Sequence, residues 1–414
     1  LHNVVARVTA NNTSAERSIS IRVFNSNEGD FWEMLGERRE YDSGAPNGVG
    51  ALVATYAEGM VVAPHPDYAN GAIFVLGGRS LITGANVSTV YVYHTDDQIA
   101  GSADRAFKYQ NLNRPLHAAL NYFGTAFVQH SYGGYIYVVG GARPNDPQNP
   151  HSTSVFEFTV QRLQVSDGAG NPLPNAGNWQ AVKNLPQQHW ANGNPIRGWA
   201  EFALVANDAS DDADDRLYLL GGRFEEEISP GSILQQMNSK VLMFATPDSA
   251  ALNGPGGDGA WYVKADDNTY LPRRFPSASI VDGKIYLAAG RTALSGMSRG
   301  IEMVQPSPIG DSANIQQLDS TNFPTLKAGV YYAVSAQDND RLWMVGGWND
   351  FFQPLPHLLS YQANAGAGVL REHAPADFGT GFGGGAILNG KLYLLTGISH
   401  GGYDHPTGLR YHIP

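Results

Sequence analysis

Arginine side chains recur directly after short apolar segments that end in a pair of small residues. Arg79, Arg223 and Arg291 follow such a pair immediately, Arg143 follows after one alanine, and Trp348 holds the fifth of these places. A guanidinium group is planar and always charged, and it forms paired hydrogen bonds with carboxylate, sulfate or phosphate. The recurrence therefore predicts a surface that binds an anionic ligand.

The loops that lead into the next apolar strand add further basic side chains. They are Arg114, His117, Arg197, Arg273, Arg274 and Lys327. Each arginine could instead pair with an acid nearby, such as Glu225, Glu226, Glu227 or Asp350, and hold its own loop in place. For one arginine the two interpretations are equally good, whereas the recurrence at equivalent positions favours ligand binding.

The longest interval between the arginine-bearing segments contains two tryptophans, in the stretch 187–199. Trp190 and Trp199, beside histidine, asparagine and arginine, are suited to sugar recognition, because flat rings stack on pyranose faces and long loops carry function. The alternative is a loop that folds over itself with both tryptophans as buried anchors. The predicted ligand-binding residues are Arg79, Arg114, Arg143, Trp190, Arg197, Arg223, Arg273, Arg291 and Trp348.

Groups able to transfer protons stand in the final loop and in one entry loop. His117, His400 and Tyr403 are the candidate catalytic residues, since a histidine or tyrosine beside an arginine could move the proton next to a uronate carboxylate. His400, Asp404 and His405 lack the spacing of a metal site, so we predict neither a metal nor a cofactor.

These side chains must be positioned by a repeated element. A short apolar strand ending in two small residues recurs along the chain, and six copies are not expected by chance. The copies are Ile73–Gly78, Ile136–Gly141, Leu217–Gly222, Ile285–Gly290, Leu342–Gly347 and Leu392–Gly397. Their consecutive apolar positions indicate strands that are covered on both faces.

A turn pair such as Asn70-Gly71 or Asp282-Gly283 precedes each copy, and such pairs favour tight hairpins. The predicted first strands of the hairpins are Gly124–Gln129, Phe202–Ala206, Ala278–Val281, Val330–Ser335 and Gly385–Leu388. Two further strands follow most copies, as in Val87–Tyr93 with Phe107–Asn111, Ser154–Val160 with Trp179–Lys183, and Lys240–Phe244 with Trp261–Lys264. Four strands at this period predict an all-β fold, a six-bladed β-propeller with four-stranded antiparallel blades, with seven blades as the alternative.

The repeat resembles the kelch family over residues 50–414. That family has a Gly-Gly pair, an aromatic residue on the third strand, which Tyr91, Phe156 and Tyr361 fit, and a tryptophan on the fourth, which Trp179 and Trp261 fit. The fourth copy departs with Ala-Gly and the sixth with Thr-Gly. The resemblance implies the fold and leaves the function open. It also implies that arginines after the glycine pair can bind acidic peptides, as in some kelch domains.

Closure of the ring is expected to use both chain ends. Only Leu409–Ile413 follows the last copy, while Ser18–Phe24 and Phe31–Leu35 are predicted strands near the start, with Trp32 in a fourth-strand position. One N-terminal strand is then spare. We expect a single domain over 1–414, with closing strands in 1–36 and repeats at 50–115, 116–197, 198–274, 275–327, 328–378 and 379–414.

The composition narrows the function further. A net charge of −11 argues against nucleic-acid binding, and no apolar run is long enough to cross a bilayer. The absence of cysteine excludes thiol chemistry and the tyrosine–cysteine crosslink that copper-radical oxidases of this fold need. The start at Leu1 without methionine suggests a processed chain, so we expect an extracellular or periplasmic protein.

The sequence thus predicts a recognition module that binds an acidic glycan or an acidic peptide or protein, without inserting into a membrane. The alternative is a carbohydrate-active enzyme, a lyase or epimerase acting on acidic sugars. A second alternative is a structural subunit of a surface assembly, in which the spare strand contacts another copy and the chain is an oligomer.

Overall fold

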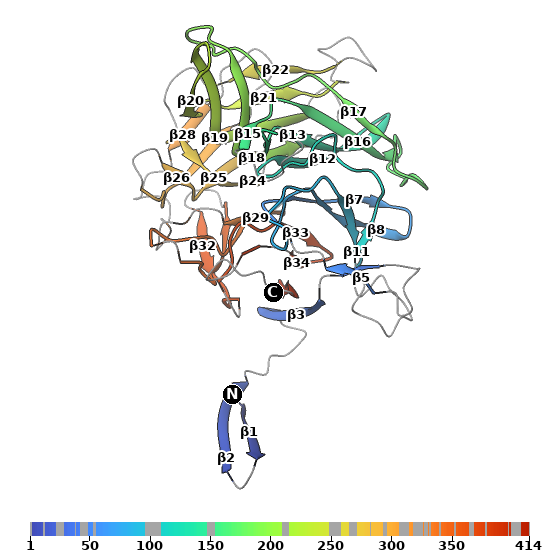
Figure 1. Cartoon of the computed structure of the whole chain (residues 1–414), viewed down its shortest axis with the longest axis vertical. Coiled ribbons are helices and arrows are strands. Elements are labelled where there is room, and N and C mark those ends of the chain that lie inside the picture. The colour runs from blue at the N-terminus through green and yellow to red at the C-terminus, as the bar shows by residue number, and fades with distance from the viewer. Residues whose placement is uncertain are drawn as a thin grey trace.

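The computed structural model describes residues 2–10, 13–21, 29–37, 39–41, 49–52, 55–95, 109–146, 154–208, 215–247, 258–264, 271–281, 283–292, 296–305, 314–317, 326, 330, 333–338, 341–351, 353–363, 368–376, 379–395, 397–398 and 407–413. All regular elements in these residues are β-strands, and none is a helix. The fold is therefore all-β, built mainly from four-stranded antiparallel sheets in a propeller-like arrangement (Figure 1).

The first large sheet follows the predicted order of strands, and the second follows it except at its third strand. The first contains β7 (Gly59–His65), β8 (Tyr68–Leu76), β10 (Val90–Tyr93) and β11 (Tyr109–Asn111), and β4 (Arg39–Tyr41) and β5 (Val49–Leu52) extend it. β4 lies parallel to β11. The second contains β12 (Gly124–His130), β13 (Gly133–Val139), β16 (Val160–Asp167) and β17 (Trp179–Ala181).

The middle sheets differ in their size. The third contains β18 (Ile196–Asn207), β19 (Arg216–Ser229), β21 (Leu242–Ala245) and β22 (Ala260–Val263), and β20 (Ser232–Met237) pairs with the far half of β19. The fourth contains β24 (Ser277–Val281), β25 (Lys284–Ala288), β27 (Ile301–Gln305) and β28 (Asn314–Gln317).

The last two sheets bring the chain ends together. The fifth contains β29 (Val334–Asp338), β30 (Arg341–Val345), β31 (Leu358–Gln362) and β32 (Val369–Glu372). The sixth contains β33 (Gly385–Leu388), β34 (Lys391–Leu394), β35 (Thr407–His412) and, as its outer strand, β3 (Phe31–Glu37). The pairing of β3 with β35 matches Trp32 with Tyr411 and confirms that Phe31–Leu35 completes the last sheet.

The first strand of each sheet lies toward the middle of the molecule, and the outer strands lie at the periphery (Figure 1). Contacts run from β7 to β12, to β18, to β24, to β29, to β33 and back to β7. The spare N-terminal segment forms a hairpin of β1 (His2–Ala10) and β2 (Thr13–Ile21), whose described strands pair only with each other.

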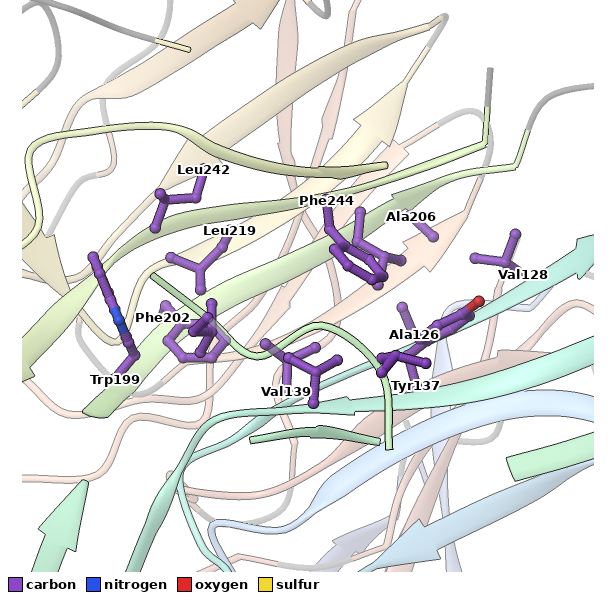
Figure 2. Close-up of a cluster of buried hydrophobic side chains, with 14 of the residues drawn as sticks. Ala126, Val128, Tyr137, Val139, Trp199, Phe202, Ala206, Leu219, Leu242 and Phe244 are labelled. Atoms are coloured by element: carbon purple, nitrogen blue, oxygen red, sulfur yellow. The ribbon is translucent and has the colours of Figure 1, made fainter. Parts of the chain in front are cut away.

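The second strand of a sheet is apolar at several consecutive positions because both of its faces are covered there. In β13, Ile136 and Val138 pack toward the first sheet, whereas Tyr137 and Val139 pack toward the third, and all four are buried. Figure 2 shows Tyr137 and Val139 facing side chains of the third sheet. Burial of such side chains contributes about 1.5–3 kcal/mol each, so packing between neighbouring sheets holds the molecule together.

The third strand of the second sheet was predicted wrongly. It is β16, which begins at Val160, whereas the predicted segment Ser154–Val160 contains β15 (Ser154–Phe156), which pairs with β14 (Ala142–Pro144) in a separate two-stranded sheet. Phe156 is therefore not the third-strand aromatic of this sheet. The observed strand carries buried polar residues, such as Arg162, whose guanidinium group stacks on the ring of Tyr135. These residues interrupt the apolar pattern that predicts a buried strand.

Candidate functional site

The loops that follow the second strands and the loops that enter the first strands pair with each other. β6 (Thr55–Tyr56) pairs with β9 (Arg79–Ser80), and β23 (Arg273–Arg274) pairs with β26 (Arg291–Thr292). In the third sheet the extensions of β18 and β19 do the same, with Ala200 opposite Arg223. We call the surface formed by these loops the arginine face.

Glycine pairs join the second strands to these loops. Gly140 has φ +55°, and a Cβ there would lie 2.7 Å from the carbonyl oxygen of Trp199 in the next sheet. Gly141 donates its N–H to that carbonyl at 2.8 Å. Only glycine combines this backbone conformation with so close an approach, so the glycine pair sets where Arg143 emerges.

Five residues on the segments that lead to the channel have left-handed backbone conformations; four of them precede a first strand, and one lies within β18. They are Ala57, Tyr122, Glu201, Phe275 and Phe382, with φ between 52° and 67°. We call them the inner turn residues. Left-handed conformations of non-glycine residues are strained and concentrate at functional sites.

Backbone hydrogen bonds link the inner turn residues from sheet to sheet. The N–H of Ala57 donates to the carbonyl of Phe382 at 2.6 Å, and that of Tyr122 donates to Ala57 at 3.0 Å. Glu201 donates to Tyr122 at 3.1 Å, and Phe275 donates to Glu201 at 2.7 Å. The strained conformation is thus held by a chain of bonds that runs around the middle of the arginine face.

The aromatic inner turn residues meet over the central channel. The ring of Tyr122 lies 5.2 Å from Phe275 and 6.3 Å from Phe382, measured between centroids. They line a small cavity together with Glu58 and Glu201. Phe202 and Pro276 line both this cavity and a larger channel between the first strands, so the aromatic rings lie at the channel mouth.

Glu201 is the charged member of this group. Its carboxylate accepts two hydrogen bonds from Arg223, one of them from Nε at 2.6 Å, and it lies 3.8 Å from the guanidinium of Arg274. The carboxylate is nearly inaccessible to solvent, whereas the side chains of Arg223 and Arg274 are 21% and 23% exposed. The arginines therefore keep surface on which a second anion could bind.

Tyr122 adds a hydroxyl group that keeps its proton. Burial raises the pKa of Tyr122 well above its ordinary value, and the charges of Tyr56 and Glu201 raise it further. The positive charges of Arg79 and Arg274 act in the opposite direction and are outweighed. At neutral pH this hydroxyl is a hydrogen-bond donor at the edge of the cavity.

The remaining predicted arginines are all engaged by the fold. Arg79 donates from Nε to Gly84 O at 2.7 Å, Arg114 donates to Gly177 O at 3.1 Å, and Arg143 pairs with Glu157. Arg197, half exposed, pairs with Glu227 at 2.9 Å.

Arg273 is the most deeply buried of the predicted arginines. It is 1% exposed and pairs with Glu302 at 2.6 Å, so a ligand on the surface does not touch it. Arg291 and Trp348 are partly exposed on the arginine face, and Arg291 lies opposite Arg274.

His117 is exposed and bonds through Nε2 to the hydroxyl of Thr159 at 3.1 Å, which in turn lies 3.4 Å from a carboxylate oxygen of Glu157. It belongs to the surroundings of Arg143 rather than to the inner turn residues. The other two candidate catalytic residues, His400 and Tyr403, and the predicted surface residue Lys327 lie outside the described residues.

The loop with the two tryptophans is packed against the protein. Trp199 is fully buried and donates Nε1–H to Pro186 O at 3.0 Å, and Trp190 stacks on it with centroids 6.1 Å apart. Asn192 and Asn194 each donate to Glu226 Oε1 at 2.7 Å. This geometry is that of a loop folded over itself, and sugar binding by Trp190 stays a prediction.

Glu201 and Tyr122, with Phe275 and Phe382, were absent from the predicted site. A sequence signal was available for Tyr122, Phe275 and Phe382, which stand two or three residues before a first strand, whereas Glu201 lies within β18. They were missed because their types differ from repeat to repeat and only the backbone conformation is shared.

Two kinds of feature are absent from the described ranges. No group of three histidine, aspartate or glutamate side chains there could hold a metal ion. No helix in the same residues could span a membrane.

Comparison with known proteins yields structural matches alone. No family model matches the chain, and no curated protein matches it. Among solved structures it is similar to one titled "Structure of YjhT", with a TM-score of 0.54 and 13% sequence identity, covering 85% of this chain and 93% of the other. At this identity the similarity concerns the fold, and it agrees with a propeller-like arrangement of sheets.

Proposed function

We propose that the chain is a six-bladed β-propeller of the kelch type. The described residues contribute six large sheets, their first strands contact one another in a cycle, and β3 completes the sheet that contains β35. Closing a ring with strands from both chain ends removes open sheet edges. The glycine pairs with their following arginines support the kelch assignment.

We propose further that the arginine face binds an anionic ligand, as part of an extracytoplasmic recognition module. The observation that carries this proposal is the group around Glu201. Arg223 and Arg274 both lie against its carboxylate, and the positive charge of Arg79 acts to lower the pKa of the neighbouring Tyr122. Three guanidinium groups thus lie around Glu201 and Tyr122, and their partly exposed surface favours an acidic glycan or an acidic peptide.

The test removes positive charges from the arginine face and leaves the buried carboxylate of Glu201 with its main partner. We choose Arg79→Gln with Arg274→Gln, since Arg223 is the main partner of Glu201 and is left in place. Each charge-assisted hydrogen bond contributes about 1.5–3 kcal/mol, so the double variant should bind oligogalacturonate or a polyglutamate peptide at least ten-fold more weakly. Titration calorimetry at low salt measures the affinity.

The matched control is Arg341→Gln with Arg371→Gln, which removes the same charge from the fifth sheet, away from the glycine-pair loops. It should leave the affinity unchanged. Equal affinities for the wild-type protein and the Arg79/Arg274 variant would sink the proposal.

A second candidate is an enzyme that acts on acidic sugars, a lyase or an epimerase. It is favoured by Tyr122, which keeps its proton, beside the carboxylate of Glu201 and two arginines that could neutralise a uronate. Incubation with uronate polysaccharides should then raise the ultraviolet absorbance or, for an epimerase, change the proton NMR spectrum of the sugar. A Tyr122→Phe variant should lose the activity. If no uronate polysaccharide gives a change in absorbance or in the NMR spectrum, recognition remains the proposed function.

A further inference from the structure

A second cavity lies at the end of the first sheet that points away from the arginine face. Its volume is about 640 Å³, and residues 62–71, which include the turn between β7 and β8, form one of its walls. The pairing of β7 with β8 runs from Gly59 and Leu76, next to the arginine face, to His65 and Tyr68 at the other end. The cavity is therefore separate from the group around Glu201.

The second sheet supplies an apolar wall of the same cavity. Phe127 on β12 and Pro172, in the loop between β16 and β17, both line it. This loop keeps its shape because Asp167 Oδ1 accepts the N–H groups of Ala169 and Asn171 at 2.9 and 2.8 Å. The cavity thus combines a preformed apolar wall with a few polar groups, as small-molecule sites usually do.

Tyr68 lines the cavity, and the proton of its hydroxyl group is directed into the protein. Burial lowers the pKa of His94, so its neutral ring donates from Nε2 to Gln110 Oε1 at 3.1 Å and accepts the O–H of Tyr68 at Nδ1. Burial and the negative charge of Asp67 raise the pKa of Tyr68 to about 12, so Tyr68 keeps this proton. Toward a ligand, its oxygen can therefore only accept a hydrogen bond.

Two further acceptors lie at the rim of the cavity. Asn70 donates from Nδ2 to Asn389 Oδ1 at 2.8 Å, which leaves its carbonyl oxygen for a ligand. The side chain of Asp67 is 69% exposed, and its negative charge acts on both His65 and Tyr68. No lysine or arginine is among the described residues that line the cavity. The polar groups at this rim thus suit a ligand that donates hydrogen bonds.

We propose that this cavity binds an organic cation, a protonated amine carried on an apolar carbon skeleton. The ammonium group would donate hydrogen bonds to the oxygens of Asp67 and Tyr68, and the carbon atoms would pack on Phe127 and Pro172. An anion is disfavoured because the lining contains a carboxylate and no basic side chain. The net charge of −11 acts in the same direction. This site is additional to the anion binding proposed for the arginine face.

The experiment titrates the full chain with n-butylamine and follows binding by saturation-transfer NMR. n-Butanol has the same carbon chain without the charge, and we expect it to bind about ten-fold more weakly. Asp67→Asn keeps the shape of the side chain and removes its charge, so it should weaken n-butylamine binding by a similar factor. The matched control Asp350→Asn makes the same change at an exposed aspartate of a glycine-pair loop and should leave the affinity unchanged.

A free polyamine and a lysine side chain of another protein both carry this chemistry. Competition against n-butylamine by spermidine and by a short lysine peptide distinguishes the two sources, because the natural source should compete more strongly. Acetylation of the lysine should abolish competition by the peptide, since it removes the positive charge. Competition by neither spermidine nor the peptide would contradict the inference.

Equal binding of n-butylamine and n-butanol to the wild-type protein would overturn the inference without any variant. So would an unchanged affinity for n-butylamine in Asp67→Asn. The Arg79/Arg274 variant separates this inference from the proposed function, because it should lose oligogalacturonate binding and still bind n-butylamine like the wild type. Loss of n-butylamine binding in that variant would place the amine on the arginine face and contradict the inference.

Discussion

At the scale of single residues, the arginines were predictable and their partners were not. Arg143 and Arg223 follow glycine pairs, which a sequence shows directly. Their acids, Glu157 and Glu201, lie 14 and 22 positions away. Glu157 reaches Arg143 because β14 pairs with β15, and Glu201 reaches Arg223 because the extensions of β18 and β19 pair with each other. Nearness in sequence had suggested Glu225 and Glu226, of which Glu226 binds the amides of Asn192 and Asn194 instead.

A pH dependence follows from two buried histidines of the first sheet. Burial lowers the pKa of His94, and the nearby His65 lowers it further; burial also lowers the pKa of His65. Below about pH 6.5 the unfolded chain takes up protons that the folded chain does not. Stability is therefore complete above that pH and is lost as the pH falls.

Urea unfolding at pH 8 and pH 5.5 measures this effect. The variant His94→Gln keeps a donor for Gln110 and should show a smaller loss of unfolding free energy between the two pH values than the wild type. His117→Gln, at an exposed position, should behave like the wild type. An equal loss of unfolding free energy between the two pH values in all three proteins would contradict the assignment of this pH dependence to His94.

At the scale of elements, hairpins were the most predictable feature. The predicted strand Gly124–Gln129 is β12 to within one residue, and Gly385–Leu388 is β33. Their turns and apolar runs are local signals. β16 could not be found in this way because Gln161 and Arg162 are buried against residues of other strands. The two-residue strands of the arginine face are too short to show a sequence pattern that predicts a strand.

The glycine pairs permit a sharp test of how sheets are joined. Gly140→Ala should destabilise the protein by more than the about 1–2 kcal/mol that a left-handed alanine costs, since the new Cβ would also press on Trp199 O. Gly283→Ala is the matched control, with φ +69° and no atom within 4 Å of the new Cβ. Thermal unfolding should show the larger decrease in Tm for Gly140→Ala. Equal decreases would mean that the contact between sheets is unimportant.

At the scale of the whole molecule, the loops of the six large sheets in the described residues meet on one surface. The first strands contact one another in a cycle, and β3 supplies the outer strand of the sheet that ends the chain. The inner turn residues are then linked around the channel mouth, where Glu201 and Tyr122 stand among arginines. A repeat read from the sequence predicts such sheets, but the meeting of their loops at one site requires the assembled molecule.

The central claim is that this shared surface recognises anions. An array of acidic and neutral glycans and peptides, read at low and at high salt with wild-type protein, tests it most directly. We predict binding to acidic members alone, decreasing steeply as salt screens the charges. Binding that ignores the charge of the ligand, or that persists unchanged at high salt, would contradict it.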